Sequence, residues 1–183
     1  MSEVKFSAEL VENRLVVWDP KEGTALFKLG YYGKPLGIPK PKTFDFKVPL
    51  LLDLLEGLYL FETKRLVIYE NGKKVPKREL LRKAKRIYRD FQLKYHVYKD
   101  LRDKHLIVQP GIKFGCDFAV YQRGPGIDHA PFMIQVKHKT ETLDAVEIVR
   151  AGRLATTVRK RFIIAVPGVG SSVQYVVFRW WKA

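Results

Sequence analysis

The stretch YKDLRDKHLIVQPGIKFGCDFAVYQRGPGIDHAPFMIQVKHKTETLDAVEIVRAGRLATTVRK, residues 98–160, decides the fold. From Ile112 to Tyr121 apolar side chains alternate with polar or small ones, and this period of two predicts a half-buried strand that ends at Tyr121. The QRGPG segment that follows predicts an exposed turn, because its glycines and proline suit neither a helix nor a central strand. His129 comes after that turn, and Phe132–Val136 is expected to form the next strand.

The rest of the C-terminal half predicts a helix and two further strands. Asp144 and Glu147 form a capping-box pattern, which starts a helix that carries Arg153. The apolar run FIIAV, residues 162–166, suits a strand buried on both faces, so Lys160 lies at the corner between helix and strand. VQYVVFRWW, residues 173–181, suits the last strand. This order is that of a compact α/β nuclease core.

The N-terminal half predicts a small α/β (α+β) domain of its own. Val4–Asp19 suits two short strands, and Val48–Leu60 shows the apolar spacing of a helix. Asn71-Gly72 suits the type I′ turn of a hairpin, after which Pro76 is expected to restart a helix.

A long irregular segment separates these elements. KLGYYGKPLGIPKPKTF, residues 28–44, contains three prolines and three glycines that oppose regular structure, and it predicts a basic inserted loop at about residues 30–43. No proline or glycine interrupts residues 77–105, so the junction near Phe91 is expected in a helix or a tight turn. We therefore predict two domains, residues 1–90 and residues 91–183.

Charge is the strongest compositional signal. The chain has 34 Lys and Arg residues against 19 Asp and Glu residues, a formal net charge of +15, and such a surface attracts polyanions. Residues 73–104 concentrate this charge, either as a solvated helix face or as an RNA contact. The single cysteine, Cys116, suits plain packing and excludes an internal disulfide, and no apolar run suits a membrane span or a signal peptide. A cytoplasmic protein without membrane contact is expected.

Three blocks resemble the archaeal tRNA-intron (tRNA-splicing) endonucleases: KFGCDFAVYQRG, the histidine shortly after it, and GRLATTVRK. The resemblance extends upstream through LLLDLLEGLYLFETKRLVIYENGKKV, and it implies a restriction-endonuclease-like C-terminal nuclease domain. It also implies a catalytic triad of Tyr121, His129 and Lys160. The implied reaction removes introns from precursor tRNA at bulge-helix-bulge motifs, leaving a 2′,3′-cyclic phosphate and a 5′-hydroxyl.

The residue chemistry separates two nuclease mechanisms. A metal-dependent nuclease needs clustered carboxylates, and here the restriction-like pattern consists of Asp117 followed by Gln135-Val136-Lys137, in which a neutral amide replaces the second acid. Without a metal or other cofactor, RNA can be cleaved by its own 2′-hydroxyl. That lyase-type route needs a base, an acid and a cation; histidine suits the acid, and a cation such as Lys160 would make a tyrosine base feasible.

Recognition and assembly are expected from the resemblance. In this family two arginines hold a bulged base, and the matching positions are Arg153 and Arg179; Lys40 and Lys42 lie where some members present an RNA-contacting loop. Family dimers dock through an acidic loop between the last two strands, but here that loop reads PGVGSSV and has no acidic residue. We therefore expect a heterotetramer with a related structural chain that carries the acidic loop.

Other interpretations stay open at this point. Taken singly, Tyr121 suits a packed rim aromatic, His129 a turn residue and Lys160 a solvated helix end. The chain could also be a metal-dependent junction nuclease that uses Asp117, or a non-catalytic RNA-binding subunit. A homotetramer held by other contacts is the alternative assembly.

Overall fold

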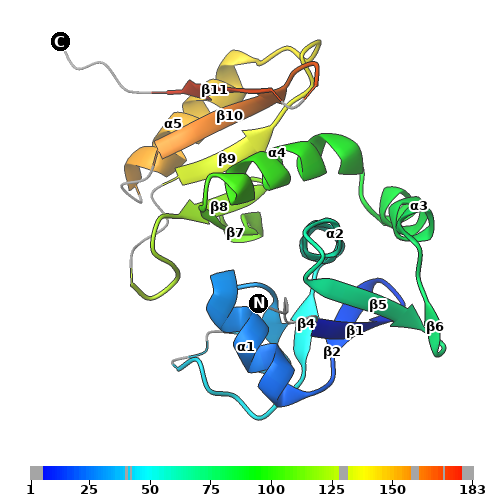
Figure 1. Cartoon of the computed structure of the whole chain (residues 1–183). Coiled ribbons are helices and arrows are strands. Elements are labelled where there is room, and N and C mark those ends of the chain that lie inside the picture. Colours follow the sequence, from blue (N-terminus) through cyan, green and yellow to red (C-terminus); the bar gives the residue numbers. More distant parts are fainter. Residues whose placement is uncertain are drawn as a thin grey trace. The chain divides into compact units, whose positions relative to one another are not determined.

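The computed structural model describes residues 6–39, 41, 43–127, 132–157, 161–170 and 172–178 (Figure 1). The chain forms two compact units, Met1–Phe91 and Gln92–Ala183, and each is built on one mixed sheet. Between them the chain passes from the end of helix α3 at Ile87 to the start of helix α4 at Phe91 through a tight turn, in which Asp90 has φ 57°.

The N-terminal unit has a six-stranded sheet in the order β3-β4-β2-β1-β5-β6. Strands β1 and β5 are parallel, and the other neighbours are antiparallel. The strands are β1 (Phe6–Val11), β2 (Arg14–Val17), β3 (Lys34–Pro35), β4 (Leu50–Leu52), β5 (Leu66–Glu70) and β6 (Lys73–Lys74). The two strands expected in Val4–Asp19 are confirmed as β1 and β2, and the hairpin turn at Asn71-Gly72 is confirmed by positive φ at both residues.

Helices α1 (Pro20–Gly30) and α2 (Leu54–Glu62) pack on the sheet face that carries Leu15 and Leu50. Gly57 makes the close approach of α2 possible, because a Cβ there would lie 1.9 Å from Leu15 Cδ1. Helix α3 (Lys77–Ile87) packs on α2 through the buried Leu80 and Ala84. The helix expected after Pro76 is therefore confirmed.

Two N-terminal expectations were wrong in detail. Helix α2 begins at Leu54 instead of Val48, because Leu50–Leu52 pairs with β2 as strand β4. Asp53 then caps the helix in a capping box, in which the Glu56 side chain accepts a hydrogen bond from the Asp53 amide. The segment 28–44 is not wholly irregular: α1 continues to Gly30, and Lys34–Pro35 pairs with β4. The buried Glu56 also accepts a hydrogen bond from the Gly33 amide at 2.9 Å, which ties the start of this loop to α2.

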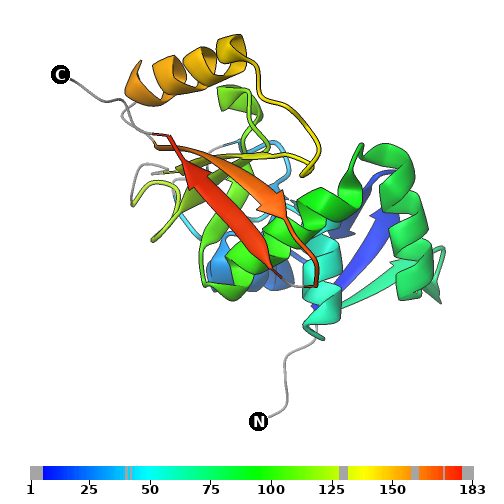
Figure 2. The same ribbon diagram turned by 90° about the horizontal axis from the view of Figure 1, so that it is seen from above.

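The C-terminal unit has a five-stranded sheet in the order β11-β10-β9-β8-β7. Strands β9 and β10 are parallel, and the other neighbours are antiparallel. Figures 1 and 2 show helices α4 (Phe91–Asp103) and α5 (Ala145–Thr157) on opposite faces of this sheet. The strands are β7 (Ile107–Pro110), β8 (Phe118–Tyr121), β9 (Phe132–Val136), β10 (Arg161–Pro167) and β11 (Val173–Val177).

The strand expected from Ile112 was wrong in its first half. Residues Ile112–Phe114 form a 3-10 helix, η1, and Ile112 is 84% exposed. Gly115, with φ 65°, ends η1 and turns the chain, so strand β8 begins only at Phe118. The alternation is therefore a coincidence of composition over residues 112–116, whereas the expected end at Tyr121 is confirmed.

Three other C-terminal expectations have clear outcomes. Phe132–Val136 is confirmed as β9, and FIIAV is confirmed as the almost wholly buried part of β10. The capping box at the start of α5 forms only in part: the Glu147 amide donates to Asp144 Oδ1 at 2.6 Å, but the Glu147 carboxylate bonds Lys137 instead. No helix in the described residues has the length and apolarity needed to cross a membrane.

Candidate functional site

Three strand ends meet at one edge of the C-terminal sheet. Val120 of β8 pairs with Phe132, the first residue of β9, and Phe132 pairs with Arg161, the first residue of β10. Tyr121 comes directly after Val120, so the end of β8 and the starts of β9 and β10 lie side by side. We call these three adjoining strand ends the Tyr121 edge, which is distinct from the outer strands β7 and β11 of the sheet. Because side chains alternate along a strand, Tyr121 points to the face covered by α5, on the opposite side from Val120.

The expected site residues are described unequally. Tyr121 is half-buried at the end of β8, and Arg153 is exposed on α5. His129, Lys160, Arg179, Lys40 and Lys42 lie outside the described residues. In the sequence His129 comes three residues before Phe132, and Lys160 comes immediately before Arg161.

A further cation lies at the same edge and was not singled out from the sequence. Arg161 is exposed, and its guanidinium carbon lies 6.0 Å from the centre of the Phe132 ring. The pairing places Arg161 on the face of Phe132 and Val120, opposite to that of Tyr121. In the sequence, Arg161 could have been singled out only by its place next to Lys160. Two adjacent basic residues are not a specific indication of a functional site.

The other end of β8 carries Asp117, whose carboxylate is held by three donors. Lys94 Nζ of α4 lies 2.8 Å from Oδ1, while Gln135 Nε2 and the Val136 amide each donate to Oδ2 at 2.8 Å. The Asp117 side chain is only 11% exposed. The side-chain amide of Gln135 thus donates a hydrogen bond to the Asp117 carboxylate. A second carboxylate at position 135 would instead repel the Asp117 carboxylate. This arrangement ties α4 to β8 and β9.

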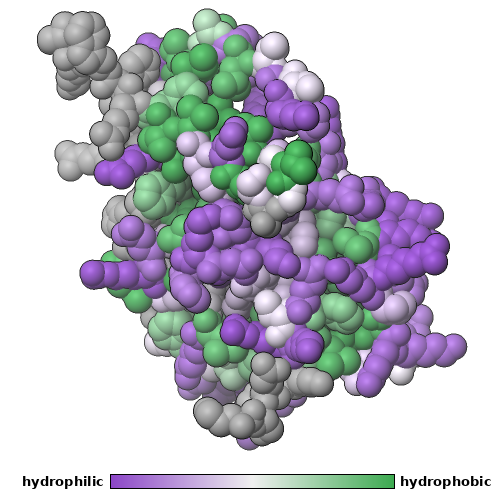
Figure 3. Space-filling view, turned by 45° about the horizontal axis from the view of Figure 1, so that its top comes forward, coloured by the Kyte–Doolittle hydropathy of each residue, from purple (hydrophilic) through white to green (hydrophobic). Residues whose placement is uncertain are grey.

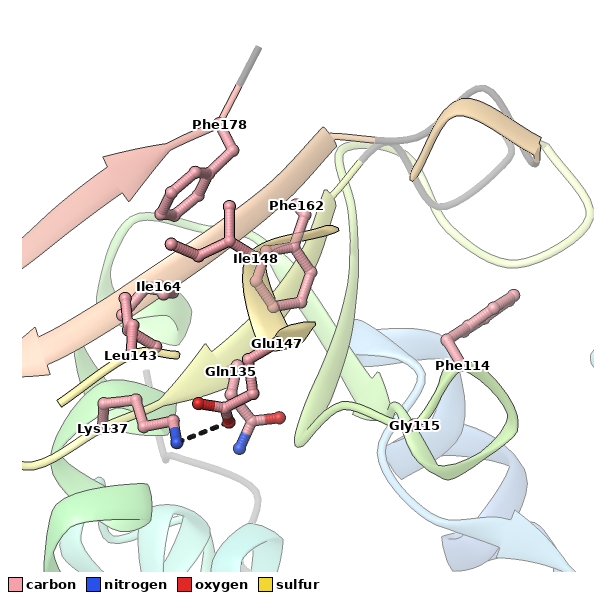
Figure 4. A pocket seen from close by; sticks show the side chains of 10 residues that line it. All are labelled: Phe114, Gly115, Gln135, Lys137, Leu143, Glu147, Ile148, Phe162, Ile164 and Phe178. Atoms are coloured by element: carbon pink, nitrogen blue, oxygen red, sulfur yellow. Dashed lines mark hydrogen bonds and ion pairs between the residues drawn. The ribbon is translucent and has the colours of Figure 1, made fainter. Parts of the chain in front are cut away.

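Lys137, the third residue of the restriction-like pattern, is engaged as well. Its Nζ donates to Glu147 Oε1 at 2.8 Å, and this hydrogen bond raises the pKa of Lys137. Figure 4 shows the pair at the polar side of a pocket of about 190 Å³ beneath the first turn of α5. Most of the pocket wall is apolar, with Phe162 and Ile164 of β10 and Phe178 beside it. Lys137 therefore anchors α5 to the sheet.

The described residues offer no ready metal site or thiol nucleophile. They contain no group of three or more His, Cys, Asp or Glu side chains that could hold a metal ion. Cys116 is buried with Met133, Phe162 and Ile164, and burial raises the pKa of its thiol to about 11. The expectation that Cys116 is a packing residue is confirmed.

Both units match known protein families. Residues 6–81 match the profile of the tRNA intron endonuclease, N-terminal domain, and residues 91–175 match that of the tRNA intron endonuclease, catalytic C-terminal domain. A tRNA-splicing endonuclease from Hyperthermus butylicus is 48% identical over 177 residues, which cover 96% of this chain and 98% of the relative. One from Sulfurisphaera tokodaii is 36% identical over 176 residues, covering 95% of this chain and 98% of the relative.

Proposed function

We propose that Tyr121, His129 and Lys160 perform the cleavage in this chain, which belongs to the tRNA intron endonuclease family. The chain is an endonuclease that removes introns from precursor tRNA: its family matches span residues 6–81 and 91–175, the second being the catalytic domain, and full-length archaeal relatives are named tRNA-splicing endonucleases. The observation that supports the triad is the meeting of three strand ends at the Tyr121 edge.

Chain length brings the two other residues into range of this edge. Consecutive Cα atoms are 3.8 Å apart, so the His129 Cα lies at most about 11 Å from that of Phe132, and the Lys160 Cα about 4 Å from that of Arg161. Neighbouring strands are separated by roughly 5 Å. Side chains of His129 and Lys160 can therefore reach a phosphate held beside Tyr121.

The chemistry requires three groups around one phosphate. Tyr121, as phenolate, takes the proton of the 2′-hydroxyl, whose oxygen attacks the adjacent phosphorus. His129 donates a proton to the departing 5′-oxygen, and Lys160 stabilises both the phenolate and the extra negative charge of the phosphorane. The P–O5′ bond breaks, and the products carry a 2′,3′-cyclic phosphate and a 5′-hydroxyl. No metal ion takes part in this scheme.

Recognition by shape completes the proposal. The RNA is a bulge-helix-bulge motif, since A-form grooves hide most sequence information while bulged bases can be splayed out. Arg153 and Arg179 hold such a base by stacking, which tolerates any base identity; the exposure of Arg153 on α5 is compatible with this role. Lys40 and Lys42 contact the RNA backbone from the loop at about 30–43.

The proposed assembly is a cytoplasmic heterotetramer of two copies of this chain and two of a related structural chain. The segment PGVGSSV, residues 167–173, has no Asp or Glu, so the acidic docking loop must come from the other chain, and electrostatic complementarity then selects the partner. Strand β11 is at the sheet edge, with Val176 50% and Val177 46% exposed. Such an edge suits pairing with another subunit.

A reconstitution experiment tests the proposed function. Precursor tRNA is incubated with this chain alone, with the related acidic-loop chain alone, and with both mixed, and the RNA ends are identified by their sensitivity to phosphatase and kinase. We expect little cleavage by either chain alone and full cleavage by the mixture, with cyclic phosphate and 5′-hydroxyl ends. A homogeneous tetramer of this chain that cleaves fully would overturn the proposed assembly, and 3′-hydroxyl with 5′-phosphate ends would overturn the chemistry.

A further inference from the structure

Helix α3 of the N-terminal unit has a basic face that the proposed catalytic site does not use. Four basic residues fall within about 100° of the helix circumference and about 12 Å of its axis. They point away from the buried side of the helix, which carries Leu80 and Ala84. All four are exposed, and we call them the basic stripe: Arg78, Arg82, Lys85 and Arg86.

Most charges of the basic stripe are uncompensated. Within the described part of the chain Arg78, Lys85 and Arg86 have no carboxylate within 4.0 Å, and Arg82 has only the partly exposed Glu79 at 3.5 Å. Two exposed lysines of the neighbouring strand β6, Lys73 and Lys74, also lack an acidic partner among the described residues. This surface therefore carries excess positive charge in contact with solvent.

The next helix differs, although its sequence is also basic. On α4, Lys94 pairs with Asp117, and the buried Arg102 donates to Tyr98 Oη at 2.9 Å and to the Val108 carbonyl at 3.1 Å. Just beyond its end, Lys104 pairs with Asp100. The basic segment 73–104 thus has an outward-facing part, formed by the basic stripe with Lys73 and Lys74, and a part on α4 whose charges serve the C-terminal unit itself. The other two basic residues of α3 pair within the N-terminal unit, Lys77 with Glu62 and Lys83 with Glu70.

We propose that the basic stripe, together with Lys73 and Lys74, binds the sugar-phosphate backbone of a double-helical region of precursor tRNA. This inference rests on the substrate named above, but it does not depend on which residues cleave it. The stripe contains no aromatic residue on which a splayed base could stack, so backbone contact is its natural mode. Basic side chains along 12 Å face several phosphates, because each nucleotide of a duplex carries one phosphate charge and the charges are closely spaced, about one per 1.7 Å of axis in double-stranded DNA.

Surface composition favours RNA over an acidic protein segment. Protein interfaces have an apolar centre from which charged residues are depleted, whereas interfaces with nucleic acids are strongly positive and polar. Ile87 is the one exposed large apolar residue of α3, and it lies on the side opposite Arg78. Figure 3 shows mostly hydrophilic residues at the right-hand margin of the view, the side on which Figure 1 has α3 and β6.

A triple variant, Arg78→Gln, Lys85→Gln and Arg86→Gln, tests the stripe in the assembled enzyme. Binding is measured with a precursor tRNA whose cleavage sites carry 2′-deoxyribose, so that affinity is read without cleavage, over a range of salt concentrations. Three lost phosphate contacts should raise the Kd roughly 10- to 100-fold near 0.15 M salt and lower the slope of log Kd against log salt by about three. The rate of cleavage at saturating enzyme should stay within about twofold of the parent.

The matched control removes the same charge elsewhere: Lys21→Gln and Lys28→Gln on α1 with Lys113→Gln on η1, all exposed. Its Kd and salt slope should stay close to those of the parent. An unchanged Kd and slope in the stripe variant would overturn the inference. So would loss of tetramer mass with unchanged RNA affinity of the remaining tetramer, since the stripe would then dock a protein. Loss of the saturating rate without loss of affinity would also count against it.

Discussion

The two ends of strand β8 have opposite characters, although only three residues lie between Asp117, which precedes the strand, and Tyr121, which ends it. At one end Asp117 is nearly buried and its carboxylate is occupied by Lys94, Gln135 and the Val136 amide. At the other end Tyr121 is half-buried beside the starts of β9 and β10. A restriction-like nuclease would work at the first end, and the proposed RNA chemistry works at the second. The comparison teaches that Asp117 serves to connect α4, β8 and β9, so its restriction-like position in the sequence does not by itself indicate a reactive site.

The strongest test of this comparison replaces His129, the proposed acid. His129→Ala should slow single-turnover cleavage by roughly 10²- to 10⁴-fold, because the departing 5′-oxygen loses its proton donor, while precursor tRNA binding stays nearly unchanged. The measurement uses the reconstituted enzyme in excess over RNA, with Kd determined in parallel.

His138 provides the matched control at the other end of β9. It lies two residues after Val136 and is exposed, and its ring Nδ1 lies 2.7 Å from Thr140 Oγ1. His138→Ala should leave the cleavage rate within about twofold of the parent. If His129→Ala instead weakens binding and keeps the rate of the bound complex, His129 is an RNA contact and the Tyr121 edge lacks its acid.

A second test addresses the Asp117 end, where the expected effect is on stability. Asp117→Ala leaves the Lys94 ammonium and two N–H donors without their acceptor, and breaking a buried ion pair is strongly destabilising. Because the Lys94 side chain is still 28% exposed, water offsets part of the cost, and we expect a loss of about 2 to 4 kcal/mol in the free energy of unfolding. Urea unfolding followed by circular dichroism measures it.

The control for this variant is Asp45→Ala, at an exposed loop position of the N-terminal unit, where a change within about 0.5 kcal/mol is expected. At a temperature where Asp117→Ala is folded, its cleavage rate should match that of the parent. A folded Asp117→Ala protein that binds RNA but no longer cleaves it would make Asp117 part of the reaction.

Local patterns predicted much of this fold, and tertiary contacts explain where they failed. Phe132–Val136 and the Asn71-Gly72 turn were predicted correctly because the strand preference of a short apolar run and the chemistry of a turn are local properties. The prediction of a strand from Ile112 failed because Gly115 has a positive φ and turns the chain. The alternation of apolar and polar residues along the sequence does not reveal this turn. The capping box formed only in part because the Glu147 carboxylate bonds Lys137, the residue that follows β9.

The candidate site also has a part that could be predicted from the sequence and a part that could not. Tyr121 could be placed at a strand end from its own neighbours, and the pairing of β8, β9 and β10 then defines the edge. The structural use of Asp117 could not be predicted, because Lys94 belongs to a helix distant in sequence and nothing near Asp117 points to it. For the same reason the division of the basic segment between α3 and α4 needed the three-dimensional contacts.

The smallest expected effect sharpens the comparison most directly, because it asks whether a metal acts at all. We expect cleavage in excess EDTA to stay within about twofold of the rate with Mg²⁺, provided that the RNA is folded. Cobalt(III) hexammine, whose ammine ligands do not exchange, keeps the RNA folded without coordinating to protein oxygens.

If activity is abolished by EDTA and restored by Mg²⁺ but not by cobalt(III) hexammine, an inner-sphere metal is required. Asp117 would then have to exchange Lys94 and Gln135 for a cation, and the Asp117→Ala protein would lose cleavage under the same conditions. Retained activity in EDTA, together with a catalytically normal Asp117→Ala protein, excludes a metal-dependent reaction at Asp117 and leaves the Tyr121 edge as the proposed site.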